Sequence, residues 1–87
     1  MIKKTITIKN KYGLHALPAS RFVKTTDKFK SDIKITKDGV EVDGRSIMGI
    51  LTLACEKGSL IELYVSGVDE QEAFEALSKI LEGEESG

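Results

Sequence analysis

Hydrophobic and polar residues alternate at the start of the chain and then change to a helical spacing. Residues 2–8 carry apolar side chains at every second position, which is typical of a strand with one buried face. After a loop over 10–13, helical spacing predicts a helix over 16–27, with Pro18 tolerated in its first turn. The apolar side of this helix is expected to carry Ala16, Ala19, Phe22, Val23 and Thr26.

Alternating residues return in the middle of the chain and predict three further strands. Residues 33–36 and 40–42 both alternate, and Asp38-Gly39 between them is a strong signal for a two-residue hairpin turn. A third alternating run predicts a strand over 60–65, after a break at Lys57-Gly58-Ser59.

Two more helices are expected in the second half. Ser46 precedes the apolar segment 47–54, and its hydroxyl is suited to cap a short helix there. Residues 69–72 begin and end with acidic side chains at the spacing of a capping box, and helically spaced apolar residues follow over 73–81. Residues 83–87 form a polar tail that is expected to fray.

The predicted order of elements is strand, helix, two strands, helix, strand and helix. Strands that alternate, rather than read as continuous apolar runs, favour an antiparallel sheet with one buried face. The sequence therefore predicts an α+β fold, a two-layer open-faced sandwich whose four-stranded antiparallel sheet is covered on one face by three helices. A chain of 87 residues, 40% of them hydrophobic, suits a single domain over 1–87.

The composition limits the kinds of site the chain can form and the compartment in which we expect it. The one cysteine, Cys55, cannot form an internal disulfide, and with a single histidine it cannot build a metal site. We therefore expect no metal and no cofactor. No apolar stretch approaches the roughly 20 residues of a membrane span, and the first residues lack the apolar run of a secretory signal. We expect a cytoplasmic protein without membrane insertion.

Charge is distributed unevenly along the chain. Residues 1–37 contain ten Lys and Arg and two acidic residues, whereas residues 38–87 contain three and twelve. The basic first half favours an acidic protein partner. Nucleic acid is a weaker candidate, because two Tyr and three Phe supply few stacking platforms and the acidic half would repel phosphates.

His15 is the only histidine and lies where the first helix is expected to begin. A helix N-terminus offers unpaired backbone N–H groups and a partial positive charge, which suit a phosphate group. An imidazole at that place can act as a nucleophile and leave the transferred phosphoryl group on those N–H groups. The alternative from spacing alone is an ordinary capping or surface histidine.

Two motifs resemble those of the HPr family of phosphocarrier proteins. Gly13-Leu14-His15-Ala16-Leu17-Pro18-Ala19-Ser20 is similar to the family's phosphohistidine motif, and Gly44-Arg45-Ser46-Ile47-Met48-Gly49 resembles the motif around its regulatory serine. The separation of the motifs, the chain length and the order of elements also match. The resemblance therefore extends over essentially the whole chain.

The resemblance implies a phosphoryl-transfer intermediate rather than a turnover catalyst. His15 would accept a phosphoryl group as pros-phosphohistidine from enzyme I, itself charged by phosphoenolpyruvate, and pass it to enzyme IIA of a sugar phosphotransferase system. Ser46 would be phosphorylated by an ATP-dependent HPr kinase/phosphorylase, and a transcriptional regulator would bind the phosphorylated form. The simpler alternative for Ser46 is a plain helix cap. We expect a monomer.

Leu17 departs from the family pattern, which usually has Arg at that place to contact the phosphoryl group. Helical geometry predicts that Leu17 points outward on the same stripe as Arg21 and Lys24. The expected contacts with phosphate or partners are Ala16, Leu17, Arg21, Lys24, Ile47 and Met48. The departure keeps a second hypothesis open, in which the chain is a regulatory binding module acting through Ser46 with weak or no phosphotransfer.

Overall fold

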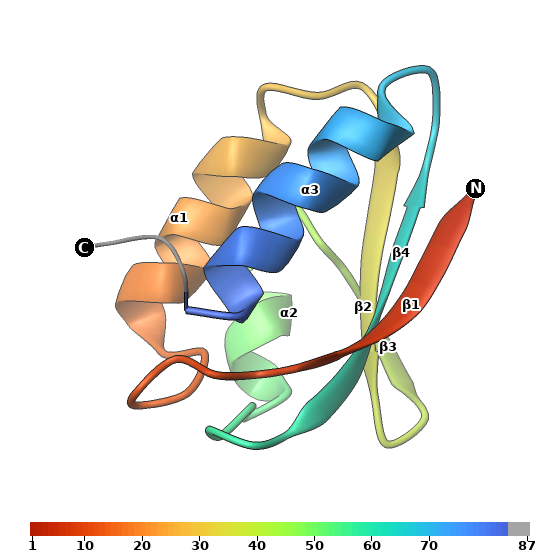
Figure 1. Ribbon diagram of the computed structural model, residues 1–87. Helices are drawn as coiled ribbons and strands as arrows, with labels where there is room; N and C mark the ends of the chain where they lie inside the picture. Colours follow the sequence, from red (N-terminus) through yellow and green to blue (C-terminus); the bar gives the residue numbers. More distant parts are fainter. Residues whose placement is uncertain (84–87) are drawn as a thin grey trace.

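The computed structural model describes residues 1–83, and these form one sheet with three helices packed on one of its faces (Figure 1). The strands are β1 (Ile2–Thr7), β2 (Asp32–Lys37), β3 (Val40–Asp43) and β4 (Leu60–Ser66). The helices are α1 (Ala16–Thr26), α2 (Ile47–Thr52) and α3 (Glu70–Leu81). The predicted fold class and order of elements are confirmed.

The sheet has the strand order β1-β4-β2-β3, and every neighbouring pair is antiparallel. β4 is central: Ile61 lies opposite Ile6 of β1, and Leu63 lies opposite Ile35 of β2. β2 and β3 form the predicted hairpin, with Asp38 and Gly39 at φ 50° and 81°. A pair of positive φ angles is what a tight turn matched to the strand twist requires.

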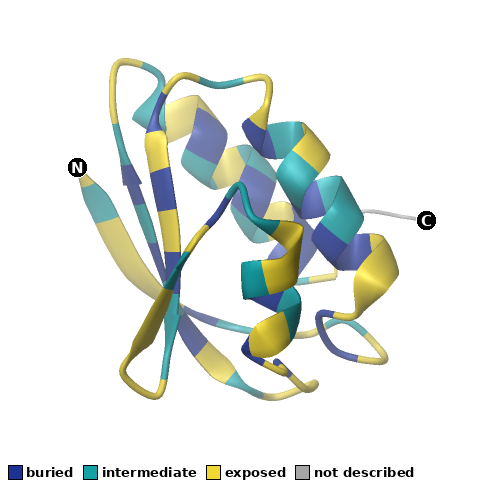
Figure 2. Ribbon diagram, turned by 180° about the vertical axis from the view of Figure 1, so that it is seen from behind, coloured by how far each residue is buried: buried dark blue, intermediate teal, exposed yellow. Residues whose placement is uncertain are grey.

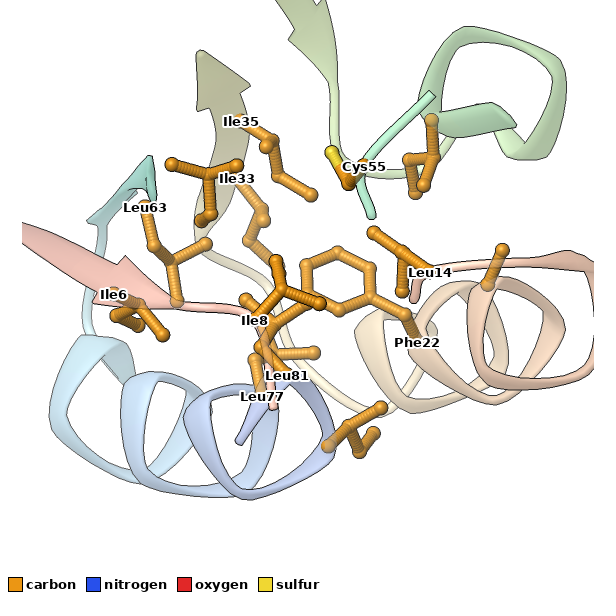
Figure 3. Close-up of a cluster of buried hydrophobic side chains, with 14 of the residues drawn as sticks. Ile6, Ile8, Leu14, Phe22, Ile33, Ile35, Cys55, Leu63, Leu77 and Leu81 are labelled. Atoms are coloured by element: carbon orange, nitrogen blue, oxygen red, sulfur yellow. The ribbon is translucent and has the colours of Figure 1, made fainter. Parts of the chain in front are cut away.

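Alternation along the strands separates the core from solvent, and Figure 2 shows buried and exposed residues in turn along β2. The helices add their own buried residues, so that the Phe22 ring of α1 lies between side chains of the sheet and those of Leu77 and Leu81 from α3 (Figure 3). Burying each such large apolar side chain contributes about 1.5–3 kcal/mol. This core holds the first turn of α1 and its preceding loop in place.

Two predictions of helix ends are wrong. α2 ends at Thr52 rather than at residue 54, because Ala54 has φ 51°, outside the helical region. Asp69 precedes α3 but does not cap it. Its carboxylate instead accepts hydrogen bonds from the backbone N–H groups of Lys30 and Ser31 and from the Ser31 hydroxyl, at 2.8, 3.1 and 2.5 Å.

The apolar side of α1 also differs in one position. Ala19, Phe22 and Thr26 are fully buried as predicted, but Ala16 is exposed. Ala16 is the first residue of α1 and lies next to the exposed His15, outside the core. Pro18, which was not predicted to be buried, is the first buried residue of the helix. Of the tail predicted to fray, residues 84–87 lie outside the described part of the chain.

Candidate functional site

His15 is the residue that immediately precedes α1, as the sequence predicted. Its backbone is extended, with φ −86° and ψ −170°, and its carbonyl oxygen accepts the first helical hydrogen bond, from the Ala19 N–H at 2.9 Å. The imidazole does not cap the helix. Of the alternative, the side-chain cap is therefore wrong, and the exposed position of His15 fits both an ordinary surface histidine and a nucleophile.

The loop before His15 is fastened to the chain segment after α2. The buried Leu14 donates its N–H to the carbonyl oxygen of Cys55 at 2.7 Å, and the Gly13 N–H closes a turn onto the Asn10 carbonyl oxygen at 3.0 Å. Gly13 has φ 75°, and a Cβ there would lie 2.4 Å from the Cys55 oxygen. Because only glycine fits this approach, the position fixes the direction in which His15 leaves the loop.

Two backbone N–H groups at the start of α1 have no acceptor within the helix. The first acceptor, the His15 oxygen, is taken by the N–H of Ala19, so the N–H groups of Ala16 and Leu17 come before the helical pattern. Pro18 has no N–H. These two donors, next to the imidazole, are the groups that a phosphoryl oxygen would meet.

Tyr12 contacts the imidazole, which the sequence analysis did not predict. The two rings are 6.2 Å apart between centroids at an interplanar angle of 69°, an edge-to-face arrangement. The Lys11 ammonium lies 5.3 Å from the centre of the Tyr12 ring. The sequence could have indicated this contact, because Tyr12 lies three positions before His15 in a loop that turns at Gly13.

His15 lies between two surface depressions. The larger, of about 380 Å³, is basic. It is lined by Lys9, Asn10, Lys11, Tyr12, His15, Leu17, Pro18, Arg21, Lys57 and Gly83. The smaller, of about 250 Å³, is lined by Tyr12, Leu14, His15, Leu51, Ala54, Cys55 and Glu56. The imidazole is therefore accessible from a charged side and from a more apolar side.

The predicted contact residues on α1 divide into two groups. Leu17 is 56% exposed and lines the basic depression, so its predicted outward direction is confirmed. Arg21, one turn further on, is half-buried and lines the same depression. Lys24 is exposed but lies beyond the depression. The structure thus brings Leu17 and Arg21 to His15, and not Lys24.

Ser46 caps α2 as predicted, because its hydroxyl oxygen accepts the Gly49 N–H at 3.0 Å. Ile47 and Met48 follow it on the surface, 36% and 70% exposed. α2 packs against α1 and contributes Leu51 to the smaller depression beside His15. The end of α2 therefore lies beside His15, whereas Arg45, next to Ser46, contacts Thr26 at the far end of α1.

Arg45 has a role that its place in the second motif did not reveal. Its guanidinium donates to the carbonyl oxygens of Thr26, Phe29 and Ser31 at 2.7, 2.9 and 2.8 Å. Arg45 thereby satisfies carbonyl oxygens at the end of α1 and in the loop that leads to β2. A third depression of about 400 Å³ lies beside Arg45 between β2 and β3, away from His15.

Cys55 belongs to the core. The thiol is buried, and burial raises its pKa despite the opposing effect of the Lys37 ammonium. Within residues 1–83, no group of three or more His, Cys, Asp or Glu residues is placed to hold a metal ion. The same part of the chain contains no helix with the length and apolar character for crossing a membrane.

Comparisons with known sequences agree with the two motifs. The profile of a family described as "PTS HPr component phosphorylation site" matches residues 2–83. Phosphocarrier protein HPr of Neisseria meningitidis is 46% identical over 83 residues, 95% of this chain and 93% of that protein. The HPr-like protein Crh of Halalkalibacterium halodurans is 48% identical over 84 residues, 97% of this chain and 100% of that protein.

Solved structures agree with the fold. HPr of Thermoanaerobacter tengcongensis superimposes with a TM-score of 0.90 at 44% identity, over 100% of both chains. A dimer of HPr from the same organism matches with a TM-score of 0.74 at 46% identity, over 97% of each chain. An exposed histidine at the start of α1 and a serine cap on α2 thus occur in a chain that belongs to the HPr family of the phosphotransferase system.

Proposed function

We propose that this chain is a working phosphocarrier, in which Nδ1 of His15 accepts a phosphoryl group from enzyme I and passes it to enzyme IIA of a sugar phosphotransferase system. The observation that carries the proposal is the imidazole at the start of α1, which makes no capping hydrogen bond and has the N–H groups of Ala16 and Leu17 beside it. Positioning and electrostatic stabilisation supply most of what phosphoryl transfer needs.

The transfer itself is a displacement at phosphorus. The lone pair of Nδ1 forms the new N–P bond, while the bond between phosphorus and the donor nitrogen of enzyme I breaks and its electron pair stays with the donor. The helix N-terminus stabilises the negative charge of the phosphoryl oxygens. In the second step His15 is the leaving group, and the acceptor nitrogen of enzyme IIA takes its place.

The test is phosphoenolpyruvate-dependent labelling with the matched enzyme I. Wild-type protein should take up label in an acid-labile, base-stable form, and His15→Ala should abolish labelling. Ser46→Ala is the control, because it keeps the nucleophile and should label normally. If the wild-type protein stays unlabelled under conditions in which an authentic HPr is labelled, the proposal is wrong.

A second candidate function is regulation through Ser46. It is favoured by Leu17, which puts no cation at the place where the family usually has Arg, and by the position of the Ser46 hydroxyl at the start of α2. A phosphate there would be stabilised by the helix N-terminus. Incubation with ATP and an HPr kinase/phosphorylase should label wild-type protein but not Ser46→Ala; absence of any label excludes this function.

We further propose that the carrier acts as a monomer in the cytoplasm. One chain alone covers the buried face of the sheet with helices and supplies every residue that lines the depression beside His15. Light scattering at micromolar concentration should give the mass of one chain, 9.5 kDa. A stable mass of twice that value would instead place this protein with the dimeric form seen for the Thermoanaerobacter protein.

A further inference from the structure

The basic depression beside His15 contains cations that the first motif does not account for. Lys9 and Lys11 come from the loop between β1 and α1, and Lys57 comes from the turn before β4. We propose that these three lysines form the anion-binding wall of the His15 site and supply the positive charge that Leu17 does not. This inference rests on the proposed phosphocarrier function, and it names the residues that hold the transferred group.

The backbone holds the two lysine-bearing segments together. Ile8 donates its N–H to the carbonyl oxygen of Ser59 at 2.9 Å, and its own carbonyl oxygen accepts the N–H of Gly58 at 2.7 Å. Lys9 directly follows Ile8, and Lys57 directly precedes Gly58. The Lys9 N–H is also bonded to the Leu81 oxygen at 3.1 Å, which ties the loop to α3. These hydrogen bonds therefore join the segment that carries Lys9 to the turn that carries Lys57 and to the end of α3.

The charges in the depression favour an anion. No carboxylate is among its lining residues in the described chain. Glu56, the neighbour of Lys57, lines the other depression on the far side of the imidazole. None of the three lysines forms an ion pair with another described residue, whereas Lys3 and Lys34 do. Within residues 1–83, no carboxylate therefore neutralises these ammonium groups.

Tyr12 connects one of these lysines to the reacting ring. Its aromatic face lies under the Lys11 ammonium and its ring contacts His15. This arrangement places the Lys11 ammonium on the ring that contacts the imidazole, and no carboxylate of residues 1–83 pairs with this ammonium to compete with a phosphoryl group. A phosphoryl group carries up to two negative charges, so several cations around it act together.

The test uses the isolated protein with inorganic phosphate, so that no partner protein is involved. Phosphate binding is followed by the NMR shifts of the His15 ring and of the Ala16 and Leu17 amides. The triple variant Lys9→Gln, Lys11→Gln, Lys57→Gln should bind phosphate about tenfold more weakly than wild type at low salt. The matched control Lys28→Gln, Lys30→Gln, Lys34→Gln removes the same charge elsewhere and should stay within about twofold of wild type.

A kinetic experiment distinguishes phosphate binding from partner docking. Potassium phosphoramidate phosphorylates histidine directly: the ring nitrogen forms an N–P bond, the bond from phosphorus to the amide nitrogen breaks, and ammonia leaves. The triple variant should react about tenfold more slowly than the control, and replacing the three lysines with Arg should restore the rate. Circular dichroism checks that each variant is folded.

The outcomes separate this inference from the proposed function. If the triple variant keeps wild-type phosphate affinity and phosphoramidate rate, the inference is overturned, even when enzyme I labels the protein normally. The same holds if only KM for enzyme I rises, because the lysines would then contact the partner. If instead enzyme I never labels the wild type while the lysine-dependent phosphate affinity is observed, the phosphocarrier function fails and the anion site stands.

Discussion

At the scale of single residues, the site combines a nucleophile in the expected place with an unexpected neighbour. His15 is exposed and uncapped at the helix start, but Leu17 presents an apolar side chain where a cation would contact the phosphoryl group. A charge-assisted hydrogen bond is roughly twice as strong as a neutral one, so its absence is expected to slow transfer. The lysines of the basic depression offset part of this loss.

Replacing Leu17 with Arg should therefore accelerate the reaction. The side chain already points outward beside His15, so the guanidinium can reach the phosphoryl group without displacing the core. We expect a gain of about tenfold in the rate of labelling by enzyme I, smaller than the roughly 10²-fold or more that loss of one such donor typically costs, because the lysines already supply positive charge. Rapid-quench measurements give the rate.

Leu17→Gln is the matched control for this substitution. It adds polarity and hydrogen-bonding groups at the same place without a charge, and should leave the rate within about twofold of wild type. An equal gain from Leu17→Gln would show that removing the exposed Leu matters rather than adding a cation. No gain from Leu17→Arg would mean that the cations already present stabilise the phosphoryl group as far as added positive charge can.

At the scale of elements, contacts distant in sequence determine how the helices are held. Arg45, from the segment before α2, binds three carbonyl oxygens at the end of α1 and in the following loop. Asp69, from the segment before α3, binds that same loop through Lys30 and Ser31. The loop between α1 and β2 is thus fixed by residues from both of the other helical segments.

The loss of Arg45 should destabilise the fold without removing the nucleophile. Arg45→Met keeps the length and most of the apolar contact of the side chain but leaves the three carbonyl oxygens without this donor. We expect a decrease of about 2–3 kcal/mol in the free energy of unfolding, measured by urea denaturation. Labelling at His15 under native conditions should persist, and Arg45→Lys, which keeps one donor group, should lose less.

Asp69 makes stability depend on pH. The Ser31 hydroxyl, followed by the Lys30 N–H, lowers the pKa of this carboxyl below its ordinary value of 3.8. A lowered folded-state pKa means that the stabilisation is complete well above pH 3.8 and is lost as the pH falls through the folded-state value. The free energy of unfolding should therefore fall on acidification below about pH 5.

Asp69→Asn tests this origin of the acid sensitivity. The variant should be less stable than wild type at pH 7, and the difference should shrink as the pH approaches 2. Asp38→Asn, at the exposed hairpin turn, is the control and should leave the pH profile unchanged. A difference that stays constant from pH 7 to pH 2 would contradict the assignment.

These contacts show why the sequence predicted some features and not others. Alternation in β4 and helical spacing in α3 predicted their buried faces, because burial follows local periodicity. The spacing of Asp69 and Glu72 also looked local, yet the partners of Asp69 lie 38 and 39 residues away. Likewise, His15 could be placed from its motif, but the meeting of Lys9 with Lys57 depends on how β1 pairs with β4.

At the scale of the whole molecule, α1 and α2 pack against each other on the same face of the sheet. The end of α2 lies beside His15 through Leu51, and the start of α2, with Ser46, lies toward the end of α1. Leu17 on α1 and Met48 on α2 are both exposed. The basic first half of the chain supplies α1 and the loop before it. Association with an acidic partner should therefore use this surface and weaken as salt is added.

A negative charge at Ser46 should oppose that association. Ser46→Asp keeps an N-cap acceptor for the Gly49 N–H while adding a charge at the start of α2. We expect labelling by enzyme I to slow about fivefold at low ionic strength, through a higher KM, and the effect to shrink at 0.5 M salt as screening shortens the range of the charge.

Ser46→Ala distinguishes the charge from the cap. It removes the hydrogen bond to Gly49, which should lower the free energy of unfolding by about 1 kcal/mol while leaving the labelling rate unchanged. If Ser46→Ala slows transfer as much as Ser46→Asp, the order of α2 matters for docking rather than its charge. If Ser46→Asp has no effect at any salt concentration, enzyme I does not reach the start of α2, and the docking surface is confined to α1 and the loop that carries His15.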